Sequence, residues 1–457
     1  MIRKLLLLGT ATLLAGCATT PPPRLPPGDV PAAFAQQAPA NAPIWPRADW
    51  WTGYGDPQLV ALIQKAQGTN LDLAQAEARL RQADARARQA GAALLPTLGL
   101  NAAANTFYGQ TSGASAHETD YSLGLGASYE LDFWGKNRDL SNAAEAARAA
   151  SAADRRTVAL TVTGSVATTY FQLLSLRERI AVAQANLKSS QDILGVVQRR
   201  VAAGYSAAAD LLQERANMAA QRATVPVLQQ QELESRDALA ILLGRPPEGF
   251  TVTGNSLGAL AVPPLAPGLP SELLARRPDI ASAEANLAAA HANLEAARTA
   301  FLPSVTLSAS GGLQYPALAA AIDTLPGVGL GTTAGVALAQ LIFDGGKTQA
   351  ITDEARAREE ELLAAYRAAV MNALTDVENA LGNADHLSAQ ETALREQVTQ
   401  AEKVLSAARR KYLSGYSDFL AVTDAERSLY TARDQLSDVR RARLAASVAL
   451  YKALGGN

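Results

Sequence analysis

The tripeptide Gly204-Tyr205-Ser206 returns as Gly415-Tyr416-Ser417, 211 residues later in a chain of 457 residues. Further pairs with this same spacing are Lys136 with Lys347, and Leu243-Gly244 with Leu454-Gly455. Self-similarity at a constant offset is typical of a chain built from structural repeats. The sequence therefore predicts two copies of one architecture, each with a chain reversal at its Gly-Tyr-Ser tripeptide.

Pairs that lie earlier in the two repeats are separated by 207 residues instead of 211. They are Asp72 with Asp279, Glu77 with Glu284, and Pro96 with Pro303. The second repeat therefore has four additional residues between Pro303 and Lys347. Insertions are tolerated best in exposed loops, so we expect a longer loop in that window.

Each repeat is predicted to hold three helical stretches in the same order. Pro96 and Pro303 end the first stretch because proline does not continue a helix, and glycine ends the last one. The expected first, long and last helices are 59–94, 138–200 and 207–243 in the first repeat, and 271–300, 346–411 and 418–454 in the second. Residues 246–270 are a Pro/Gly-rich linker between the repeats.

Two segments between the helices show the alternation of β-strands, about 97–133 and about 304–343. The clearest run is 121–133, in which apolar residues alternate with small or polar ones over 13 positions. Strands of about 9–11 residues cross an outer membrane with one face toward lipid. A soluble antiparallel sheet shows the same alternation, so the pattern predicts two hairpins and leaves both settings open.

Four strands are too few to close a sheet on itself. An open edge in lipid is forbidden because its backbone groups find no hydrogen-bond partner, and the smallest closed barrels have about eight strands. If the strands cross a membrane, the chain must therefore assemble around an axis. Two, three or four copies would give about 8, 12 or 16 strands.

The long helices are predicted to form a wall. A helix of roughly 63 residues is about 95 Å long, and neither long segment has an apolar run that spans a bilayer. Runs such as 143–150, which are rich in alanine, allow neighbouring helices to approach closely. Broad alanine-rich faces favour a hollow helical cylinder over a solid coiled-coil rod, which usually has leucine-rich seams.

The first residues predict export from the cytoplasm. Two cations, Arg3 and Lys4, precede a short apolar core, as in a secretory signal peptide. The ending Leu14-Ala15-Gly16-Cys17 resembles the bacterial lipobox. That resemblance implies cleavage before Cys17 and a covalent N-acyl diacylglycerol on this residue, which is the one cysteine of the chain. The alternative is an ordinary signal peptide with an incidental cysteine.

Composition disfavours several functions. Lys and Arg number 41 against 43 acidic residues, so no basic field for nucleic acid is expected. One cysteine and three histidines leave little for a metal site, and no nucleophile–base pair or phosphate-binding loop is visible. We expect neither an enzyme nor a metal or other cofactor; a structural or adhesive coiled-coil protein is the remaining rival to a channel.

Several segments together resemble the TolC-like outer-membrane efflux factors, in particular the NodT-type lipoprotein branch that serves resistance–nodulation–division (RND) pumps. The matching segments are Trp50-Trp51, Asp56-Pro57-Gln58-Leu59, Pro96, Leu131-Asp132-Phe133-Trp134-Gly135-Lys136, Arg276-Arg277-Pro278-Asp279-Ile280, Pro303, and Gly415 with Asp424-Ala425. The resemblance extends over about residues 45–455.

This resemblance implies a mixed α and β membrane protein. Three chains would form a 12-stranded outer-membrane β-barrel that is continuous with a long periplasmic α-helical barrel. The implied function is passive export of drugs or other toxic small molecules, delivered by an inner-membrane RND pump and a periplasmic adaptor. An outer-membrane factor for type I protein secretion is the alternative. The predicted organisation is a signal peptide (1–16), a tether (17–58), a first repeat (59–245), the linker (246–270) and a second repeat (271–457).

The resemblance also places a gate near the second turn. Asp424 matches an acidic constriction position and Leu420 a bulky one, while Ala421 stands where the family has a second carboxylate. Asp424 paired with Arg427 on a solvated helix face is the alternative.

The turns themselves are the expected adaptor contact, through Gly204, Tyr205, Gly415 and Tyr416. Cations before the turns have three interpretations: they bind the adaptor, they tether a closed tip through Asp210 and Asp418, or they are solvated residues favoured by the helix dipole. These cations are Arg199, Arg200, Arg409, Arg410 and Lys411.

Overall fold

The computed structural model describes residues 31–35, 45–111, 114–264, 268–314 and 329–456. The chain divides into two compact units. The first unit holds Arg79–Ala152 and Ser282–Arg367, and the second holds the other described residues. Each unit therefore contains residues from both repeats, so the repeats do not coincide with the compact units.

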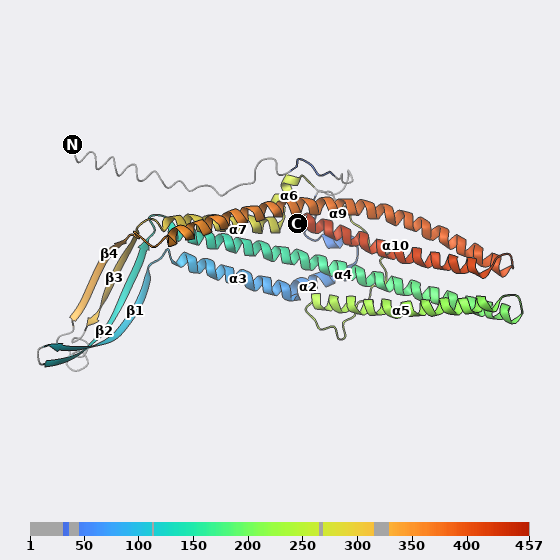
Figure 1. Cartoon of the computed structure of the whole chain (residues 1–457), viewed down its shortest axis with the longest axis horizontal. Helices are drawn as coiled ribbons and strands as arrows, with labels where there is room; N and C mark the ends of the chain where they lie inside the picture. Colours follow the sequence, from blue (N-terminus) through green and yellow to red (C-terminus); the bar gives the residue numbers. More distant parts are fainter. Residues whose placement is uncertain (1–30, 36–44, 112–113, 265–267, 315–328, 457) are drawn as a thin grey trace. The chain divides into compact units, whose positions relative to one another are not determined.

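The two repeats contain the same elements in the same order (Figure 1). In the first repeat these are α2 (Pro57–Thr69), α3 (Leu71–Ala92), β1 (Thr97–Thr111), β2 (Ala114–Leu131), α4 (Lys136–Ala202) and α5 (Ala208–Leu242). In the second they are α6 (Pro270–Arg276), α7 (Pro278–Thr299), β3 (Ser304–Gln314), β4 (Gly329–Ala339), α9 (Lys347–Leu413) and α10 (Phe419–Ala453). A short 3-10 helix, η1 (Trp50–Tyr54), precedes them.

Corresponding helices have equal lengths: 67 residues in α4 and α9, 35 in α5 and α10, and 22 in α3 and α7. A 67-residue helix is about 100 Å long. No helix within the described ranges has an apolar stretch long enough to cross a bilayer.

The prediction of one continuous helix before each hairpin is wrong. Asn70 separates α2 from α3, and Arg277 separates α6 from α7, and both residues are extended with ψ of 133° and 122°. Asn70 Oδ1 accepts a hydrogen bond from the backbone N–H of Leu73, which caps α3. Arg277 precedes Pro278, whose ring disfavours helical geometry in the residue before it.

Each break is packed against the end of the last helix of its own repeat, and we call this contact the joint. Asn70 Nδ2 donates to the carbonyl of Leu242 at 2.9 Å, and Arg277 Nη1 donates to the carbonyl of Ala453 at 3.2 Å. A Cβ on Gly244 would lie 2.2 Å from the carbonyl oxygen of Thr69. Only glycine permits this approach. The Leu-Gly pair that ends each repeat, Leu243-Gly244 or Leu454-Gly455, is therefore also required at the joint.

The four strands form one antiparallel sheet in the order β1-β2-β3-β4. Residues directly opposite in the register share a face: Leu100 lies opposite Leu125, Leu123 opposite Leu313, and Leu307 opposite Val336. The apolar residues of both hairpins therefore lie on the same face, which we call the apolar face. Its members include Leu98, Leu100, Ala102, Leu123, Leu125, Ala127, Tyr129, Leu131, Val305, Leu307, Ala309, Leu313, Ala334, Val336 and Leu338.

The core of the second unit lies along the middle of α4. Tyr170, Phe171, Leu173 and Leu174 are fully or almost fully buried there. The ring of Tyr54 from η1 lies 5.1 Å from that of Phe171, measured between centroids, and its hydroxyl shares a 2.7 Å hydrogen bond with Ser447. The segment before the first repeat is therefore an integral part of this core.

Candidate functional site

Two helical turns carry the predicted adaptor contact, and both have the same backbone geometry. Gly204 and Gly415 have φ of 76° and 78°, a left-handed conformation that favours glycine. The next residue closes each turn: the N–H of Tyr205 donates to the carbonyl of Arg200, and that of Tyr416 donates to Lys411. These 6→1 bonds define a Schellman motif, which ends one helix and allows the next to begin.

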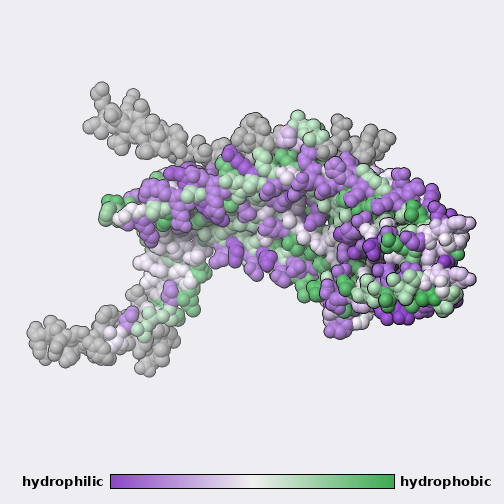
Figure 2. Space-filling model, turned by 45° about the vertical axis from the view of Figure 1, so that its right-hand side comes forward, coloured by the Kyte–Doolittle hydropathy of each residue, from purple (hydrophilic) through white to green (hydrophobic). Residues whose placement is uncertain are grey.

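The side chains at the turns face solvent. Tyr205 is 77% exposed and Tyr416 is 87% exposed. Figure 2, in which this part of the second unit comes forward, shows hydrophobic patches among hydrophilic surface. Exposed aromatic rings at a helix turn are suited to contact with another protein.

A hydrophobic cluster beneath the turns joins the two hairpins, α4–α5 and α9–α10. Val197 from α4, Tyr412 from α9, and Phe419 and Val422 from α10 are all buried in it. The rings of Tyr412 and Phe419 are 5.5 Å apart. This cluster holds the positions of both turns relative to each other.

Arg200 adds a polar link across the same place. Its Nη1 atom donates to the carbonyl of Tyr412 at 3.1 Å, and its guanidinium carbon lies 4.7 Å from the centre of the Tyr412 ring. Its Nε atom donates to Ser206 Oγ at 3.3 Å. Among the cations before the turns, Arg200 therefore links the two tips. It does so through the backbone carbonyl and the ring of Tyr412, not through a carboxylate.

Neither predicted carboxylate partner takes part in that link. Asp418 caps α10, where its Oδ1 accepts a bond from the backbone N–H of Ala421 at 3.2 Å. Asp210 lies in the first turn of α5. Within the described ranges, no ion pair joins either carboxylate to the cations before the turns.

The predicted gate residues share one side of α10. Leu420 is 61% exposed, and Asp424, one turn further along, is also exposed. Phe419, Val422 and Thr423 on the other side of α10 are buried, so Leu420 and Asp424 point away from the hydrophobic cluster. The alternative pair of Asp424 with Arg427 is not formed in the described part of the chain.

Sequence reasoning missed a buried polar seam between the two hairpins. Its carboxylates are Glu214 on α5 and Glu426 on α10, with 0% and 4% of their surfaces exposed. Arg409 Nη2 on α9 donates to Glu426 Oε1 at 2.6 Å and also to Ser189 Oγ on α4. Burial, followed by the charge of Glu426, raises the pKa of Glu214 to about 7.

A pattern in α5 could have revealed this seam. Leu211, Glu214, Gln221, Val225 and Leu228 follow helical spacing, and all are buried or half-buried. A glutamate in the middle of the inward face of a helix predicts a buried carboxyl group, whose charged form is disfavoured by loss of water.

The apolar face of the sheet is the second functional surface. Leu98, Leu100, Val336 and Leu338 are between 69% and 73% exposed. A large exposed apolar surface marks a contact with a membrane or with another protein. In the sheet as described, β1 and β4 also pair on one side only, which leaves two edges for further strands.

Cys17 lies outside the described residues. The chain that follows it is fixed to the second unit at Trp45, whose Nε1 donates to Glu272 Oε2 at 2.8 Å. The Trp45 ring also lies under the guanidinium of Arg276, 4.5 Å from its centre. Any anchor at Cys17 is therefore tethered to the joint of the second repeat.

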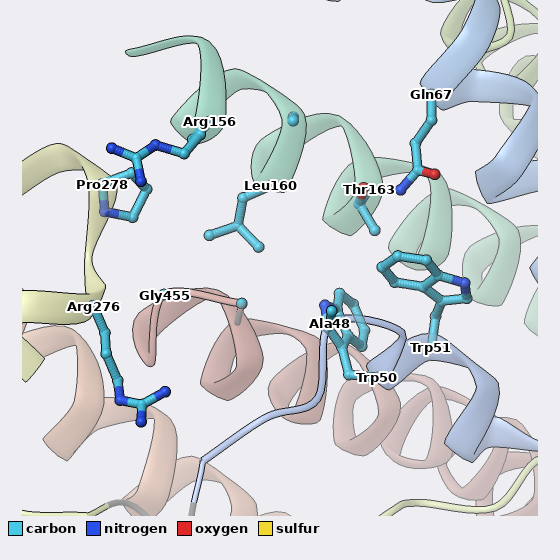
Figure 3. A pocket seen from close by; sticks show the side chains of 12 residues that line it. Ala48, Trp50, Trp51, Gln67, Arg156, Leu160, Thr163, Arg276, Pro278 and Gly455 are labelled. Atoms are coloured by element: carbon cyan, nitrogen blue, oxygen red, sulfur yellow. The ribbon is translucent and has the colours of Figure 1, made fainter. Parts of the chain in front are cut away.

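A pocket of about 160 Å³ adjoins this joint (Figure 3). Trp50 and Trp51 of η1, Leu160 and Thr163 of α4, and Gly455 after α10 line it. The ring of Trp50 is stacked on that of Tyr451 at 4.6 Å. We assign the pocket to the packing of η1 against the joint.

A sheet with an exposed apolar face and two repeated hairpins of long helices defines a class of protein: subunits of outer-membrane channels. The family model for the outer membrane efflux protein matches the chain twice, over residues 62–245 and 269–456. The chain therefore belongs to the outer membrane efflux protein family, and it acts in efflux at the outer membrane.

Relatives match it over nearly its whole length. It is 40% identical to the pyoverdine export outer membrane protein OpmQ of Pseudomonas putida, over 99% of this chain and 97% of that protein. It is 31% identical to the cation efflux system protein CusC of Escherichia coli, over 99% and 98%. The solved structure of the outer-membrane channel OprN superposes with a TM-score of 0.88 at 29% identity, covering 96% of this chain and 99% of that one. The role of the chain is thus transport.

Proposed function

We propose that three copies of this chain form a passive channel for small molecules. Each chain contributes four strands and four columns of helix, so that three copies make a 12-stranded barrel and a tunnel of 12 helical columns. The observation that carries the proposal is the sheet, whose apolar residues from both repeats share one exposed face and whose edges β1 and β4 are open. In lipid such edges must pair with those of neighbouring chains.

The cargo is a small molecule that an inner-membrane RND pump and a periplasmic adaptor deliver. OpmQ is named for the export of pyoverdine and CusC for the efflux of cations. These names favour small-molecule efflux, such as that of drugs or other toxic compounds, over the alternative of type I protein secretion. The exposed Tyr205 and Tyr416 at the turns are the proposed contact with the adaptor.

A lipid anchor on Cys17 supplements the barrel. Several acyl chains bind a membrane far more tightly than one, because each buried methylene contributes about 0.8 kcal/mol. Mass spectrometry of the mature N-terminus tests this part. We expect an N-acyl diacylglycerol on Cys17 and its loss in Cys17→Ser, while an unmodified cysteine would refute the anchor.

Leu420 and Asp424 narrow the periplasmic entrance in this proposal. Three Asp424 carboxylates around an axis would favour cations and repel anions. Conductance of purified protein in planar bilayers tests the channel, and the Leu420→Ala/Asp424→Ala double variant tests the gate. We expect a conducting wild type and a higher conductance with weaker cation preference in the variant. An unchanged conductance in the variant would exclude the gate, and a wild type that does not conduct would exclude the channel.

The cargo needs a test in cells. A strain that lacks the gene is expected to be more sensitive to a panel of drugs, dyes and metal salts, and the wild-type gene should restore resistance. Normal resistance together with loss of a secreted protein would instead favour the alternative.

A further inference from the structure

The polar seam between the hairpins contains a buried carboxyl group that is only weakly hydrogen-bonded in the described structure. Glu214 is fully buried, and its Oε1 atom has no hydrogen-bond partner among the described residues. Its Oε2 atom has only a 3.5 Å contact from Asn217 Nδ2. Burying a carboxylate without partners is costly, so this position favours the neutral acid.

Glu426 on the opposite hairpin makes the charged form of Glu214 still less favourable. Glu426 is a paired carboxylate: it accepts bonds from Arg409 Nη2 at 2.6 Å and from Ser189 Oγ at 3.1 Å. Arg409 is bonded to Glu426 and not to Glu214. An ionised Glu214 would therefore lie near the carboxylate of Glu426 without a cation of its own, and the charge of Glu426 raises the pKa of Glu214.

The groups that surround Glu214 come from four helices. Asn217 belongs to α5 itself, and Ser189 and Ser190 to α4, with the Ser190 hydroxyl also buried without a partner in the described part. Arg409 comes from α9, and Glu426 and Arg427 from α10. The charge of Glu426 raises the pKa of Glu214, whereas Asn217 and Ser190 lower it by hydrogen bonding, and burial together with Glu426 outweighs them.

Water can reach the seam. A cavity of about 140 Å³ lies between α4, α5 and α10, and Asn186, Asn217, Gln221, Thr423 and Glu426 are in its lining. A polar cavity of this size holds several water molecules. Asn217, which contacts Glu214, and Glu426 both line this cavity, so water in it lies next to the groups that surround Glu214.

The seam also lies where the hairpins are held together. Arg409 and Ser189 connect α9 to α4, and Arg200 connects the two turns further along. These polar links act together with the hydrophobic cluster that joins the two hairpins, and repulsion across the seam opposes this packing of α4–α5 on α9–α10.

We propose that Glu214 is a proton-sensitive latch of the channel tip. Protonated Glu214 allows the two hairpins to remain packed, whereas ionised Glu214 repels Glu426 and drives the hairpins apart, which widens the entrance. That the entrance widens rests on the proposed channel function; that the hairpins separate does not.

The direction of the effect follows from the raised pKa. With the hairpins apart, a hydrated Glu214 ionises near its ordinary pKa of 4.5, and with the hairpins packed it ionises near 7. The packed state is therefore weakened progressively as the pH rises between these values, and the penalty is complete above about pH 7. One proton changes the ratio of separated to packed states by up to about tenfold per pH unit.

The first test measures conductance of the full-length protein in planar bilayers from pH 4.5 to 8. We expect the open fraction of the wild type to rise with pH and then to level off. Glu214→Gln, which imitates the neutral acid, should keep the low-pH level throughout. The control Glu234→Gln changes an exposed glutamate on the same helix and should follow the wild type. A variant at position 214 that keeps the wild-type slope, or a wild type without a slope, overturns the latch.

The second test does not depend on conduction. Hydrogen–deuterium exchange of residues 186–221 is compared between the wild type and Glu214→Gln at each pH, so that the intrinsic pH dependence of exchange cancels. We expect faster exchange in the wild type above pH 7 and equal exchange near pH 4.5. Equal exchange at every pH overturns the latch. If the wild type does not conduct but shows this exchange difference, the latch stands and the channel function fails.

Discussion

The two repeats form the same joint between the helix break and the end of the last helix, but with different side chains. In both, a glycine after the last helix is pressed against the carbonyl of the residue before the helix break, at Thr69 or Arg276. In both, the residue at the break bonds a carbonyl near the end of that last helix. The first repeat uses the neutral amide of Asn70, and the second uses the buried guanidinium of Arg277.

The charge at the second joint brings in further partners. Arg277 Nη2 donates to Asp279 at 2.6 Å and to Asp376 on α9 at 3.0 Å. The residue of α4 that corresponds to Asp376 is Ser165, so the first repeat cannot form this pair. The close approach of a glycine to a backbone carbonyl is thus common to both joints, while the ionic network of Arg277 is found only in the second. A variant at the glycine should therefore destabilise either repeat, whereas a variant in the ionic network should destabilise only the second.

The largest effect is expected from Gly244→Ala. The new Cβ would lie 2.2 Å from the carbonyl oxygen of Thr69 at a φ of 64°, so the backbone must move. We expect a loss of about 3–4 kcal/mol of unfolding free energy, from the clash together with left-handed strain. The measurement is thermal unfolding of the purified protein followed by circular dichroism.

Alanine variants of two other glycines serve as comparisons for the loss of stability in Gly244→Ala. Gly455→Ala places its Cβ 2.8 Å from the carbonyl of Arg276 and should cost somewhat less. Gly204→Ala has positive φ but no neighbour within 4 Å, so strain alone should cost about 1–2 kcal/mol. Equal losses at Gly244 and Gly204 would show that the joint does not require glycine for its close approach.

Arg277→Ala ranks second. It leaves Asp279 and the carbonyl of Ala453 without their donor, and breaking a buried pair usually costs roughly 3–5 kcal/mol. Both carboxylates are partly exposed, so we expect about 2–3 kcal/mol. Asn70→Ala at the corresponding position should cost about 1 kcal/mol, as one hydrogen bond does. Similar melting temperatures for the two variants would remove the distinction between the joints.

The turns allow a smaller test. Asp418 caps α10, whereas the corresponding Ala207 gives α5 no side-chain cap. Asp418→Ala should cost about 1 kcal/mol, and Ala207→Asp should stabilise the protein by a similar or smaller amount. Hydrogen exchange in the first turns of α5 and α10 measures both changes locally. Slower exchange after Asp418→Ala would contradict the assignment of the cap.

The smallest expected effect is acid sensitivity of the second joint. Burial by itself raises the pKa of Asp279, but the bonds and charge of Arg277 outweigh it and leave the pKa below its usual value of 3.8. The ionised carboxylate therefore stabilises the fold above about pH 4 and loses this contribution as the pH falls through the lowered pKa. Melting temperatures between pH 6 and 3 should fall less in Asp279→Asn. Asp72→Asn in the first repeat should keep the wild-type slope, and identical slopes in all three proteins would contradict the prediction.

Much of the fold was accessible from the sequence because its signals are local. Positive-φ glycines mark the turns, prolines end the first helices, and the period of two in 121–133 gives the strands. The breaks at the joints were missed. Asn70 caps α3 locally through Leu73, but its amide also bonds the carbonyl of Leu242, which is far away in sequence. The Arg277-Pro278 step did carry a local signal, since a residue before proline avoids helical geometry.

The functional residues also divide into those that the sequence predicted and those that it did not. The gate positions Leu420 and Asp424 came from resemblance, and their common exposed side on α10 is compatible with that role, which stays a prediction. Glu214 and Glu426 were missed. The inward face of α5 carried a local signal for the burial of Glu214, but the meeting of the two carboxylates depends on the packing of four helices, which a single sequence does not encode locally.

The most direct test of the whole account is a cryo-electron microscopy structure of the full-length protein in lipid nanodiscs. It should show three chains around one axis, with β4 of each chain paired to β1 of the next and with Leu98, Leu125 and Leu338 against lipid. A single chain whose sheet edges are covered by its own residues, or a sheet whose apolar face packs on protein, would contradict the central claim that both repeats together build one third of a membrane channel.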